Sequence, residues 1–424
     1  MALSFMEGNE AVARGAMAAG CNFFAGYPIT PATTIFANML TMLPPKGGVC
    51  IQGEDEIASM GYCIGASMAG KKVLTATSGP GISLYSEQIS FAIGSEIPMV
   101  IVDVQRLGPS TGSATRGADS DIQFLRWGNT GGIPVVVLAP KDALDCYLLT
   151  VHAFNFAEML RCPVFIASNK EIGMTRESVD LDSLVLPPIV DRKQFQANNI
   201  NNGKYIPFEA EPSAAPDFLP IGGKTLVRQT SSTHGPDGYI TIDPNLIEEN
   251  QERLRNKIFS AEEELTLYEE NHREGADTLL ISYGVTSRAA EDACAMLQKT
   301  GKPVSTLTLK TLWPVPKKLI RAKAAPYKRI VVIEMNLGQY IDNIERVLPE
   351  KKISFYGQMD GVLIKPSKII EVIENEKKYE LHGETSRDQS AHNNRNIDYE
   401  INSHAHDSVC KNDGENTRKC HGGN

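Results

Sequence analysis

The feature that most constrains the fold is the alternation of short apolar runs with longer helical patterns between residues 22 and 168. The runs are apolar throughout, which is typical of strands that are buried on both faces. Strands of this kind form parallel sheets covered by helices, so the region is predicted to be a doubly wound α/β domain. The predicted strands are residues 22–25, 49–52, 72–76, 98–104, 134–138 and 163–167, and the predicted helices are residues 31–42, 54–70, 82–93 and 141–160.

A second alternation of the same kind begins at Asp277 and predicts a smaller α/β domain that ends near Asn375. A chain of 424 residues exceeds the size of one ordinary hydrophobic core, which also favours two domains. The predicted strands of the second domain are residues 278–282, 303–308, 329–334 and 353–356, and its predicted helices are residues 287–300, 316–325 and 337–347.

The stretch between these two domains has a different composition. Residues 181–240 are rich in Pro, Gly, Asn and Ser, and residues 244–273 form a strongly charged helical run. We interpret the first part as an ordered connection that wraps a neighbouring surface, and the second as a solvent-exposed helix. A flexible linker is the alternative. The apolar side chains that could anchor an ordered connection are Ile206, Phe208, Phe218 and Leu219.

The segment that begins at Glu376 is polar, holds five of the eight histidines and has almost no large apolar residues. Because such a segment cannot bury enough apolar surface to offset the entropy of ordering, it is predicted to be a disordered tail. A metal site in the tail is the weaker alternative, since the spacing of its cysteines fits no zinc module. Its candidate ligands are His404, His406, Cys410, Cys420 and His421. The predicted divisions are therefore residues 1–180, 181–275, 276–375 and 376–424.

Charge and cysteine usage exclude several classes of protein. The formal net charge is −9, from 42 Lys and Arg against 51 Asp and Glu, and no basic stripe is present, which argues against a nucleic-acid partner. No signal peptide or membrane-spanning stretch is found, so a cytoplasmic protein without a membrane partner is expected. The eight cysteines are scattered and form no C-x-x-C pair, which predicts reduced thiols and no metal or iron–sulfur cluster held by this chain alone.

Candidate site residues follow the predicted strands, because ligands of doubly wound sheets bind beyond the carboxyl ends of the strands. After the first strand, Thr30 stands between Pro28 and Pro31, which hold its hydroxyl rigidly near a helix start; capping that helix is the alternative role. After the second strand come three acids, residues 54–56, which open a helix of small residues. A favourable interaction with the helix dipole is enough to explain such acids, whereas the small residues also allow a flat ligand to approach.

The next two strands are followed by a glycine loop and by a loop with two arginines. Residues 77–83 read Thr-Ser-Gly-Pro-Gly-Ile-Ser, a strand–loop–helix junction suited to an anionic or polar group, although it is not a dinucleotide-binding fingerprint. Arg106 and Arg116 lie in a loop with glycines and hydroxyl residues, and together they suggest a carboxylate site. A surface loop in which these arginines pair with Asp119 and Asp121 is the alternative.

On these motifs the chain resembles the α subunit of 2-oxoacid:ferredoxin oxidoreductases, most of all the 2-oxoglutarate type (2-oxoglutarate synthase). The likeness extends from about Met6 to Asn375. It rests on the segments Gly-Tyr-Pro-Ile-Thr-Pro (26–31), Glu-Asp-Glu-Ile-Ala-Ser-Met-Gly (54–61), Thr-Ser-Gly-Pro-Gly (77–81), Gly-Pro-Ser-Thr-Gly (108–112), Lys-Glu-Ile-Gly-Met (170–174) and Glu-Met-Asn-Leu-Gly-Gln (334–339).

The resemblance implies a pyrimidine-binding domain for thiamine diphosphate, followed by a smaller domain like the C-terminal domain of transketolases. It also implies a separate β subunit that holds the diphosphate, Mg²⁺ and a [4Fe-4S] cluster. In agreement, this chain has no Gly-Asp-Gly diphosphate motif. Small γ and δ subunits are further candidate partners. The implied reaction is the reversible, CoA-dependent oxidative decarboxylation of a 2-oxoacid, 2-oxoglutarate first, with electrons passing to ferredoxin.

The resemblance also implies roles for single residues. Glu56 matches the family glutamate that hydrogen-bonds N1′ of the aminopyrimidine, which makes it the expected catalytic residue. Thr30 and Arg106 match residues that contact the 2-oxo-carboxylate end of the substrate, and Arg116 would neutralise the second carboxylate of 2-oxoglutarate, where many relatives of that type have lysine. The expected cofactor-binding residues are Tyr27, Pro28, Glu56, Ser78 and Gly79.

Three other readings stay open. The same chemistry could act on pyruvate, or on a branched-chain or aryl 2-oxoacid. The chain could be a non-catalytic partner subunit, in which Glu56 is only a charge at a helix end. A self-contained thiamine enzyme such as a transketolase is disfavoured, because the diphosphate-binding half is missing from the sequence.

Overall fold

The computed structural model describes residues 3–196 and 205–381. Its first sheet has seven strands in the order β12-β6-β7-β5-β4-β2-β3, and all neighbours are parallel except β12 and β6. The predicted parallel sheet is therefore confirmed, with small shifts at strand ends. Its strands are β2 (Phe23–Gly26), β3 (Val49–Gln52), β4 (Val73–Thr77), β5 (Met99–Gln105), β6 (Val136–Leu138), β7 (Pro163–Asn169) and β12 (Thr311–Trp313).

Helices cover both faces of this sheet. Along β2, Phe23 and Ala25 belong to one hydrophobic core and Phe24 to the other, because successive side chains of a strand point to opposite faces. One core is completed by α3 (Glu56–Met68) and α5 (Ser86–Gly94), and the other by α1 (Gly8–Ala18), α2 (Thr33–Met42) and α7 (Ala143–Leu160). The short elements of this half are β1 (Ser4–Glu7), η1 (Pro44–Lys46), α4 (Pro80–Leu84), α6 (Ile122–Trp127), α8 (Lys170–Gly173) and β8 (Arg176–Val179).

Two sequence predictions for this half need correction. Strand β3 is not buried on both faces, since Val49 and Gln52 are exposed. The reason is that β3 is an edge strand of the sheet. The single helix predicted over residues 82–93 is two helices, α4 and α5, which meet at Tyr85.

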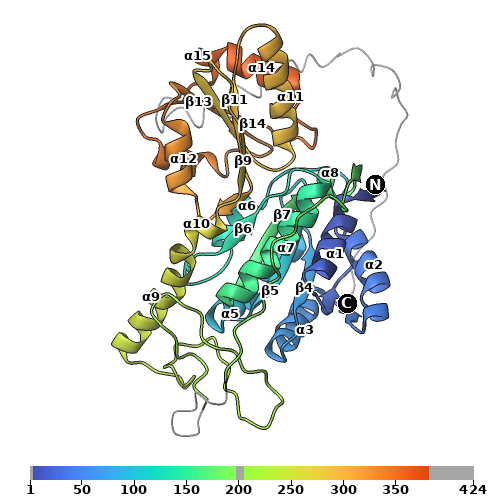
Figure 1. The fold of residues 1–424 in the computed structure, drawn as a ribbon, viewed down its shortest axis with the longest axis vertical. Helices are drawn as coiled ribbons and strands as arrows, with labels where there is room; N and C mark the ends of the chain where they lie inside the picture. Colours follow the sequence, from blue (N-terminus) through green and yellow to red (C-terminus); the bar gives the residue numbers. More distant parts are fainter. Residues whose placement is uncertain (1–2, 197–204, 382–424) are drawn as a thin grey trace, which may run out of the picture. The chain divides into compact units, whose positions relative to one another are not determined.

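The second sheet has five strands in the order β14-β13-β10-β11-β9, and only β9 runs antiparallel to its neighbour. Figure 1 shows its strands and helices in the yellow-to-red part of the chain. Its strands are β9 (Tyr268–Asn271), β10 (Thr278–Ser282), β11 (Ser305–Leu309), β13 (Arg329–Glu334) and β14 (Lys352–Gly357). Its helices are α11 (Thr286–Lys299), α12 (Lys317–Ala324), α13 (Ile341–Val347), α14 (Pro366–Glu374) and α15 (Glu376–Tyr379).

Three predictions for the second half are wrong in part. The helix predicted over residues 337–347 begins only at Ile341, because Gly338 has a left-handed backbone with φ of 96°. The predicted disorder does not begin at residue 376, since Leu381 donates its backbone N–H to Ile353 O at 2.9 Å. The segment 268–271, predicted to be helical, is strand β9 at the edge of the second sheet.

The candidate metal ligands of the tail, residues 404–421, lie outside the described residues.

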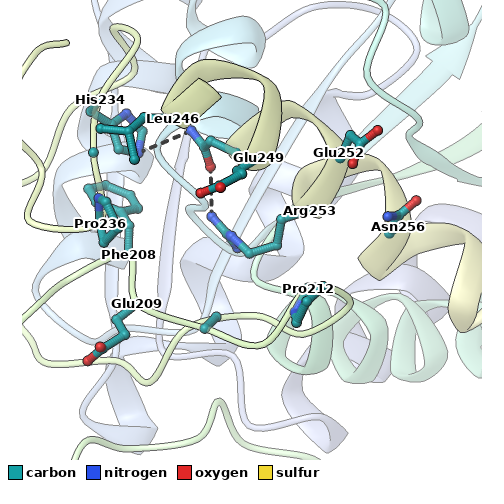
Figure 2. A pocket seen from close by; sticks show the side chains of 13 residues that line it. Phe208, Glu209, Pro212, His234, Pro236, Leu246, Glu249, Glu252, Arg253 and Asn256 are labelled. Atoms are coloured by element: carbon teal, nitrogen blue, oxygen red, sulfur yellow. Dashed lines mark hydrogen bonds between the residues drawn. The ribbon is translucent and has the colours of Figure 1, made fainter. Parts of the chain in front are cut away.

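The charged run before β9 forms α9 (Pro244–Ser260) and α10 (Glu262–Leu265), and α9 is not solvated on all sides. Its buried face carries Leu254 and Ile258 together with two cations, Arg253 and Lys257. Both cations bind the carboxylate of Glu96, which is fully buried: Arg253 Nη2 lies 2.6 Å and Lys257 Nζ 2.7 Å from it. The prediction of a solvent-exposed helix is therefore wrong for this face, because long cationic side chains replace the apolar residues that would have revealed it. Figure 2 shows Arg253 beside a pocket between α9 and the connecting segment.

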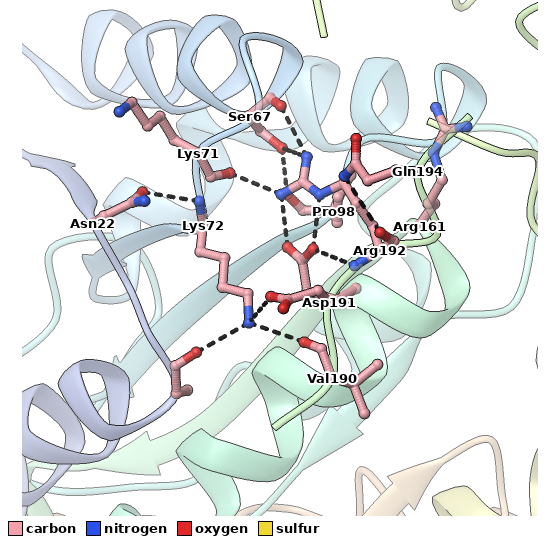
Figure 3. A network of polar contacts seen from close by, with 12 residues as sticks. Asn22, Ser67, Lys71, Lys72, Pro98, Arg161, Val190, Asp191, Arg192 and Gln194 are labelled. Atoms are coloured by element: carbon pink, nitrogen blue, oxygen red, sulfur yellow. Dashed lines mark hydrogen bonds and ion pairs between the residues drawn. The ribbon is translucent and has the colours of Figure 1, made fainter. Parts of the chain in front are cut away.

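The connecting segment is anchored to the first domain by a polar network, drawn in Figure 3. The guanidinium of Arg192 binds Glu158 at 2.6 Å and also donates to the backbone oxygens of Ser67 and Lys71. Lys72 lies 2.8 Å from Asp191. These contacts, together with the burial of Phe208 and Phe218, support the ordered connection over the flexible linker for the described part of the segment. No helix among the described residues combines the length and the apolar character that a membrane crossing requires.

Candidate functional site

Glu56 is the first residue of α3 and lies directly beyond β3. The helix begins here because Asp55 caps it, accepting a hydrogen bond from Ala58 N at 2.7 Å. The Glu56 side chain is only 7% exposed. A Cβ atom at Gly81 would lie 2.9 Å from Glu56 Oε1, so the glycine allows the carboxylate to sit against the 77–81 loop. The helix start therefore places one carboxylate in a tight position beyond the carboxyl ends of the strands.

The 77–81 loop joins β4 to α4 and carries a buried hydroxyl. Ser78 is fully buried, and its Oγ has no hydrogen-bond partner among the described residues. Gly79 has a left-handed backbone with φ of 38°, and a Cβ atom there would lie 3.6 Å from Arg106 Nε. An unpartnered buried hydroxyl costs free energy unless a ligand satisfies it, so Ser78 marks a place where a polar ligand atom fits.

Arg106 follows β5 and is buried, with 4% of its surface exposed. Its Nη1 donates to the backbone oxygen of Thr30 at 2.5 Å, and its own backbone oxygen accepts from Ser120 Oγ at 2.6 Å. The predicted surface-loop alternative is therefore wrong for Arg106, although its positive charge opposes the rise that burial causes in the pKa of Asp121. Glu56, the 77–81 loop, Arg106 and Thr30 are thus brought together at one edge of the sheet.

The loop of residues 27–32 forms a further part of this edge. Tyr27 is 38% exposed, and Pro28 is half-buried beside it. The backbone oxygen of Thr30 accepts the hydrogen bond from Arg106, and Thr30 is an exposed residue. The alternative role of Thr30 as a helix cap is wrong, because α2 begins at Thr33 behind Ala32 and has no side-chain cap.

Arg116 lies at the far end of the arginine loop and is exposed. Its backbone oxygen accepts from Leu107 N at 2.8 Å, which returns the loop to the end of β5. A Cβ atom at Gly361 would lie 2.7 Å from Arg116 Cβ, so Arg116 packs against a loop of the second half of the chain. Arg116 is therefore attached to the same loop as Arg106, but its side chain stays at the surface.

A group of buried acids behind Arg106 was not predicted as part of the site. Asp103 lies within β5, and burial raises its pKa well above the usual range. Burial likewise raises the pKa of Asp119 to about 7 and that of Glu334 to about 7. Asn336 donates to the backbone oxygen of Asp119 at 3.0 Å, which ties the first half of the chain to the second. The one feature of the sequence that pointed to these acids was Asp103, an aspartate inside a predicted strand that is otherwise apolar.

The raised pKa of Asp119 gives a stability prediction. Its ordinary pKa is 3.8, so between about pH 4 and pH 7 the folded chain holds a proton that the unfolded chain has released. The free energy of unfolding should therefore fall as the pH rises through this window. In Asp119→Asn that loss should be smaller, by on the order of 2 kcal/mol between about pH 5 and pH 8.

Urea denaturation at the two pH values measures this difference. The matched control is Asp292→Asn at an exposed position, which should follow the parent chain. If the free energy of unfolding changes with pH by the same amount in the parent chain and in Asp119→Asn, the assignment of the proton to Asp119 is contradicted.

Comparison with known proteins identifies the class to which this chain belongs. The family model "Pyruvate flavodoxin/ferredoxin oxidoreductase, thiamine diP-bdg" matches residues 14–252, more than half of the chain, and "Pyruvate:ferredoxin oxidoreductase core domain II" matches residues 276–369. The chain belongs to the pyruvate flavodoxin/ferredoxin oxidoreductase family and carries its thiamine-diphosphate-binding domain. The predicted family and fold class are confirmed.

Individual relatives narrow the comparison further. The chain is 39% identical over 370 residues to the 2-oxoglutarate synthase subunit KorA of Methanocaldococcus jannaschii, covering 87% of this chain and 98% of that protein. It is 32% identical over 373 residues to the ketoisovalerate oxidoreductase subunit VorB of Methanothermobacter marburgensis, covering 88% of this chain and 97% of that protein.

A solved structure agrees with these relatives. The 2-oxoglutarate:ferredoxin oxidoreductase of Magnetococcus marinus, with 2-oxoglutarate, coenzyme A and succinyl-CoA bound, matches with a TM-score of 0.81 at 32% identity. The match covers 88% of this chain but only 65% of the chain in that structure.

Proposed function

We propose that this chain is the α subunit of a CoA-dependent 2-oxoglutarate:ferredoxin oxidoreductase, which converts 2-oxoglutarate to succinyl-CoA and CO₂ and reduces ferredoxin, reversibly. The observation that carries the proposal is the meeting of Glu56, Ser78 and Arg106 at one edge of the sheet, within the thiamine-diphosphate-binding domain of the family. The direct test is co-expression with its β subunit, followed by an assay of ferredoxin reduction that depends on both 2-oxoglutarate and CoA.

The residues of this edge fit the pyrimidine half of thiamine diphosphate. The absence of a side chain at Gly81 lets the Glu56 carboxylate lie against the 77–81 loop, and the absence of one at Gly79 lets Arg106 lie close to the same loop. The unpartnered Ser78 hydroxyl is a ready polar contact. When bound, thiamine diphosphate supplies the carbon nucleophile and electron sink for decarboxylation. Glu56 would hold the proton at N1′ of the aminopyrimidine, because a buried carboxylate in contact with a ring nitrogen favours the protonated form of that nitrogen. Tyr27 and Pro28 would border the ring.

The substrate side of the site would be formed by arginine and threonine. Arg106 is fixed by Thr30 O and keeps a buried Nε without a partner among the described residues, so its guanidinium is positioned in advance to bind the carboxylate next to the keto group. The Thr30 side chain would contact the 2-oxo-carboxylate end. Pre-positioning lowers the entropy lost when substrate binds.

The remaining components would come from partner chains. We assign the diphosphate, Mg²⁺ and the [4Fe-4S] cluster to a β subunit, because this sequence has no Gly-Asp-Gly motif and its cysteines are scattered. Small γ and δ subunits, ferredoxin and CoA complete the proposed set of partners. We keep the proposed division of this chain into residues 1–180, 181–275 and 276–375, although β9 of the second segment joins the second sheet and β12 of the third segment joins the first.

The choice of 2-oxoglutarate is supported by the higher identity to KorA than to VorB, and it leads to a prediction for Arg116. Arg116→Ala removes the cation that would neutralise the distal carboxylate, so kcat/KM for 2-oxoglutarate should fall about tenfold or more, while kcat/KM for 2-oxobutyrate changes little. Steady-state kinetics of the reconstituted complex on both substrates measures the ratio.

The control is Arg228→Ala, a second exposed arginine, which lies in the connecting segment. Equal losses on both substrates in Arg116→Ala would exclude a role in distal-carboxylate recognition and would favour pyruvate or a branched-chain or aryl 2-oxoacid as the substrate.

A further inference from the structure

A second hollow lies away from the proposed thiamine site. It has a volume of about 550 Å³ and is formed by α6, α9, α12 and α13 together with residues around Val135 and Trp313. Val135 immediately precedes β6, so the hollow opens at the amino end of that strand, whereas Glu56 and Arg106 follow the carboxyl ends of β3 and β5. In a parallel sheet these ends face opposite edges, which separates the hollow from the proposed catalytic edge.

The hollow is strongly cationic in a chain whose net charge is −9. Five basic side chains line it, and the only carboxylate among its described lining residues is that of Glu262. The basic residues are Arg126, Arg255, Lys317, Arg321 and Arg346. An excess of cations of this size in one cavity attracts anions and raises their local concentration.

Two of these arginines are held in place by backbone oxygens. Arg321 donates through Nε to the backbone oxygen of Val347 at 3.2 Å. Arg126 donates to the backbone oxygens of Gly132 and Ile133, and its guanidinium lies 3.8 Å from the ring centre of Trp127. Backbone oxygens orient the guanidinium groups without neutralising their charge, which is the arrangement that suits a phosphate ligand.

Aromatic surface is available beside these cations. Trp127 is 58% exposed and Phe259 is 42% exposed, although large aromatic side chains are ordinarily buried. Trp313 also lines the hollow, and its ring meets the ring of Tyr340 edge-on at 5.3 Å between centres. Exposed aromatic rings next to cations form a surface on which a planar base can stack.

We propose that this hollow is a binding site for a nucleoside phosphate, whose phosphates contact Lys317, Arg321 and Arg255 and whose base stacks on Trp127 and Phe259. The volume is within the range of small-ligand pockets. The proposal is independent of the proposed catalytic function, because it uses none of the residues at the catalytic edge.

The two tryptophans of the sequence, Trp127 and Trp313, both line the hollow, so intrinsic tryptophan fluorescence of the purified full chain reports on this site alone. Titration with ADP should change the emission, and calorimetry should give the same affinity. Lys317→Ala should weaken ADP binding about tenfold or more, since it removes one charge-assisted contact. Lys318→Ala is the matched control, because this neighbouring lysine on α12 is also exposed but does not line the hollow.

Several results would overturn the proposal. It fails if ADP at millimolar concentration changes neither the emission nor the heat, or if Lys317→Ala and Lys318→Ala weaken binding equally. Binding of adenosine as tight as that of ADP would exclude the phosphate contacts. Binding of inorganic phosphate as tight as that of ADP, or unchanged affinity in Trp127→Ala by calorimetry, would exclude stacking of the base.

Discussion

Replacing Glu56 by glutamine should lower kcat of the reconstituted enzyme by about a hundredfold to ten-thousandfold, the range that general acid–base catalysis contributes. Glutamine keeps the size of the side chain, which matters because Gly81 leaves little room around Glu56 Oε1. Glutamine cannot hold the proton that, in our proposal, the Glu56 carboxylate shares with the aminopyrimidine. Subunit assembly should be unaffected, so size-exclusion chromatography of the complex should show the same species for variant and parent.

The chain offers a matched control for this experiment. Glu54 is also an acid at the start of α3, but it is exposed, and Glu54→Gln should keep kcat close to that of the parent. If Glu56→Gln retains kcat within about threefold of the parent, Glu56 is only a charge at a helix end and the chain is a non-catalytic partner. Loss of assembly together with loss of turnover would instead point to a structural role.

The largest expected effect on stability is at Glu96. Glu96→Ala should lower the free energy of unfolding by about 3–5 kcal/mol, because it leaves the buried cations Arg253 and Lys257 without their carboxylate. Urea denaturation followed by circular dichroism measures the change. The control is Glu374→Ala, which removes a surface ion pair with Lys302 and should cost less than about 1 kcal/mol.

The Glu96 carboxylate also makes the free energy of unfolding depend on pH in the acid range. Burial alone would raise the pKa of Glu96, but Lys257 and Arg253 outweigh burial and lower it from 4.5 to about 2. A carboxyl group with a lowered pKa stabilises the fold above its unfolded pKa, and this contribution disappears as the pH falls from about 4.5 towards 2. The parent chain should therefore lose stability over this range more steeply than Glu96→Ala does. Parallel curves would contradict the ion-pair assignment.

The fold was predictable where periodicity alone determines it. The apolar runs of β4, β5 and β7 are buried on every residue, and they were found because no exposed face interrupts them. The buried face of α9 was missed, because Arg253 and Lys257 read as solvated charges and their partner Glu96 is distant in the sequence. Burial that depends on pairing between distant residues leaves no local pattern.

The candidate site was predictable as a set of residue types at strand ends, but not in its contacts. The loops after β2, β4 and β5 were identified because the carboxyl ends of parallel strands meet at one edge. That Thr30 holds Arg106 through its backbone oxygen could not be read from the side chains. The buried acids Asp119 and Glu334 were missed, since they come close only after the two halves of the chain have packed.

The short path from β11 to β12 limits how the chain could be divided by protein engineering. Strand β11 ends at Leu309 in the second sheet, and β12 begins at Thr311 in the first, with only Lys310 between them. A fragment that stops before residue 276 would lose β12 and expose the edge of β6, which invites intermolecular strand pairing. The two sheets are therefore not interchangeable modules, and a chimera with a relative should exchange both together or move β12 with the first sheet.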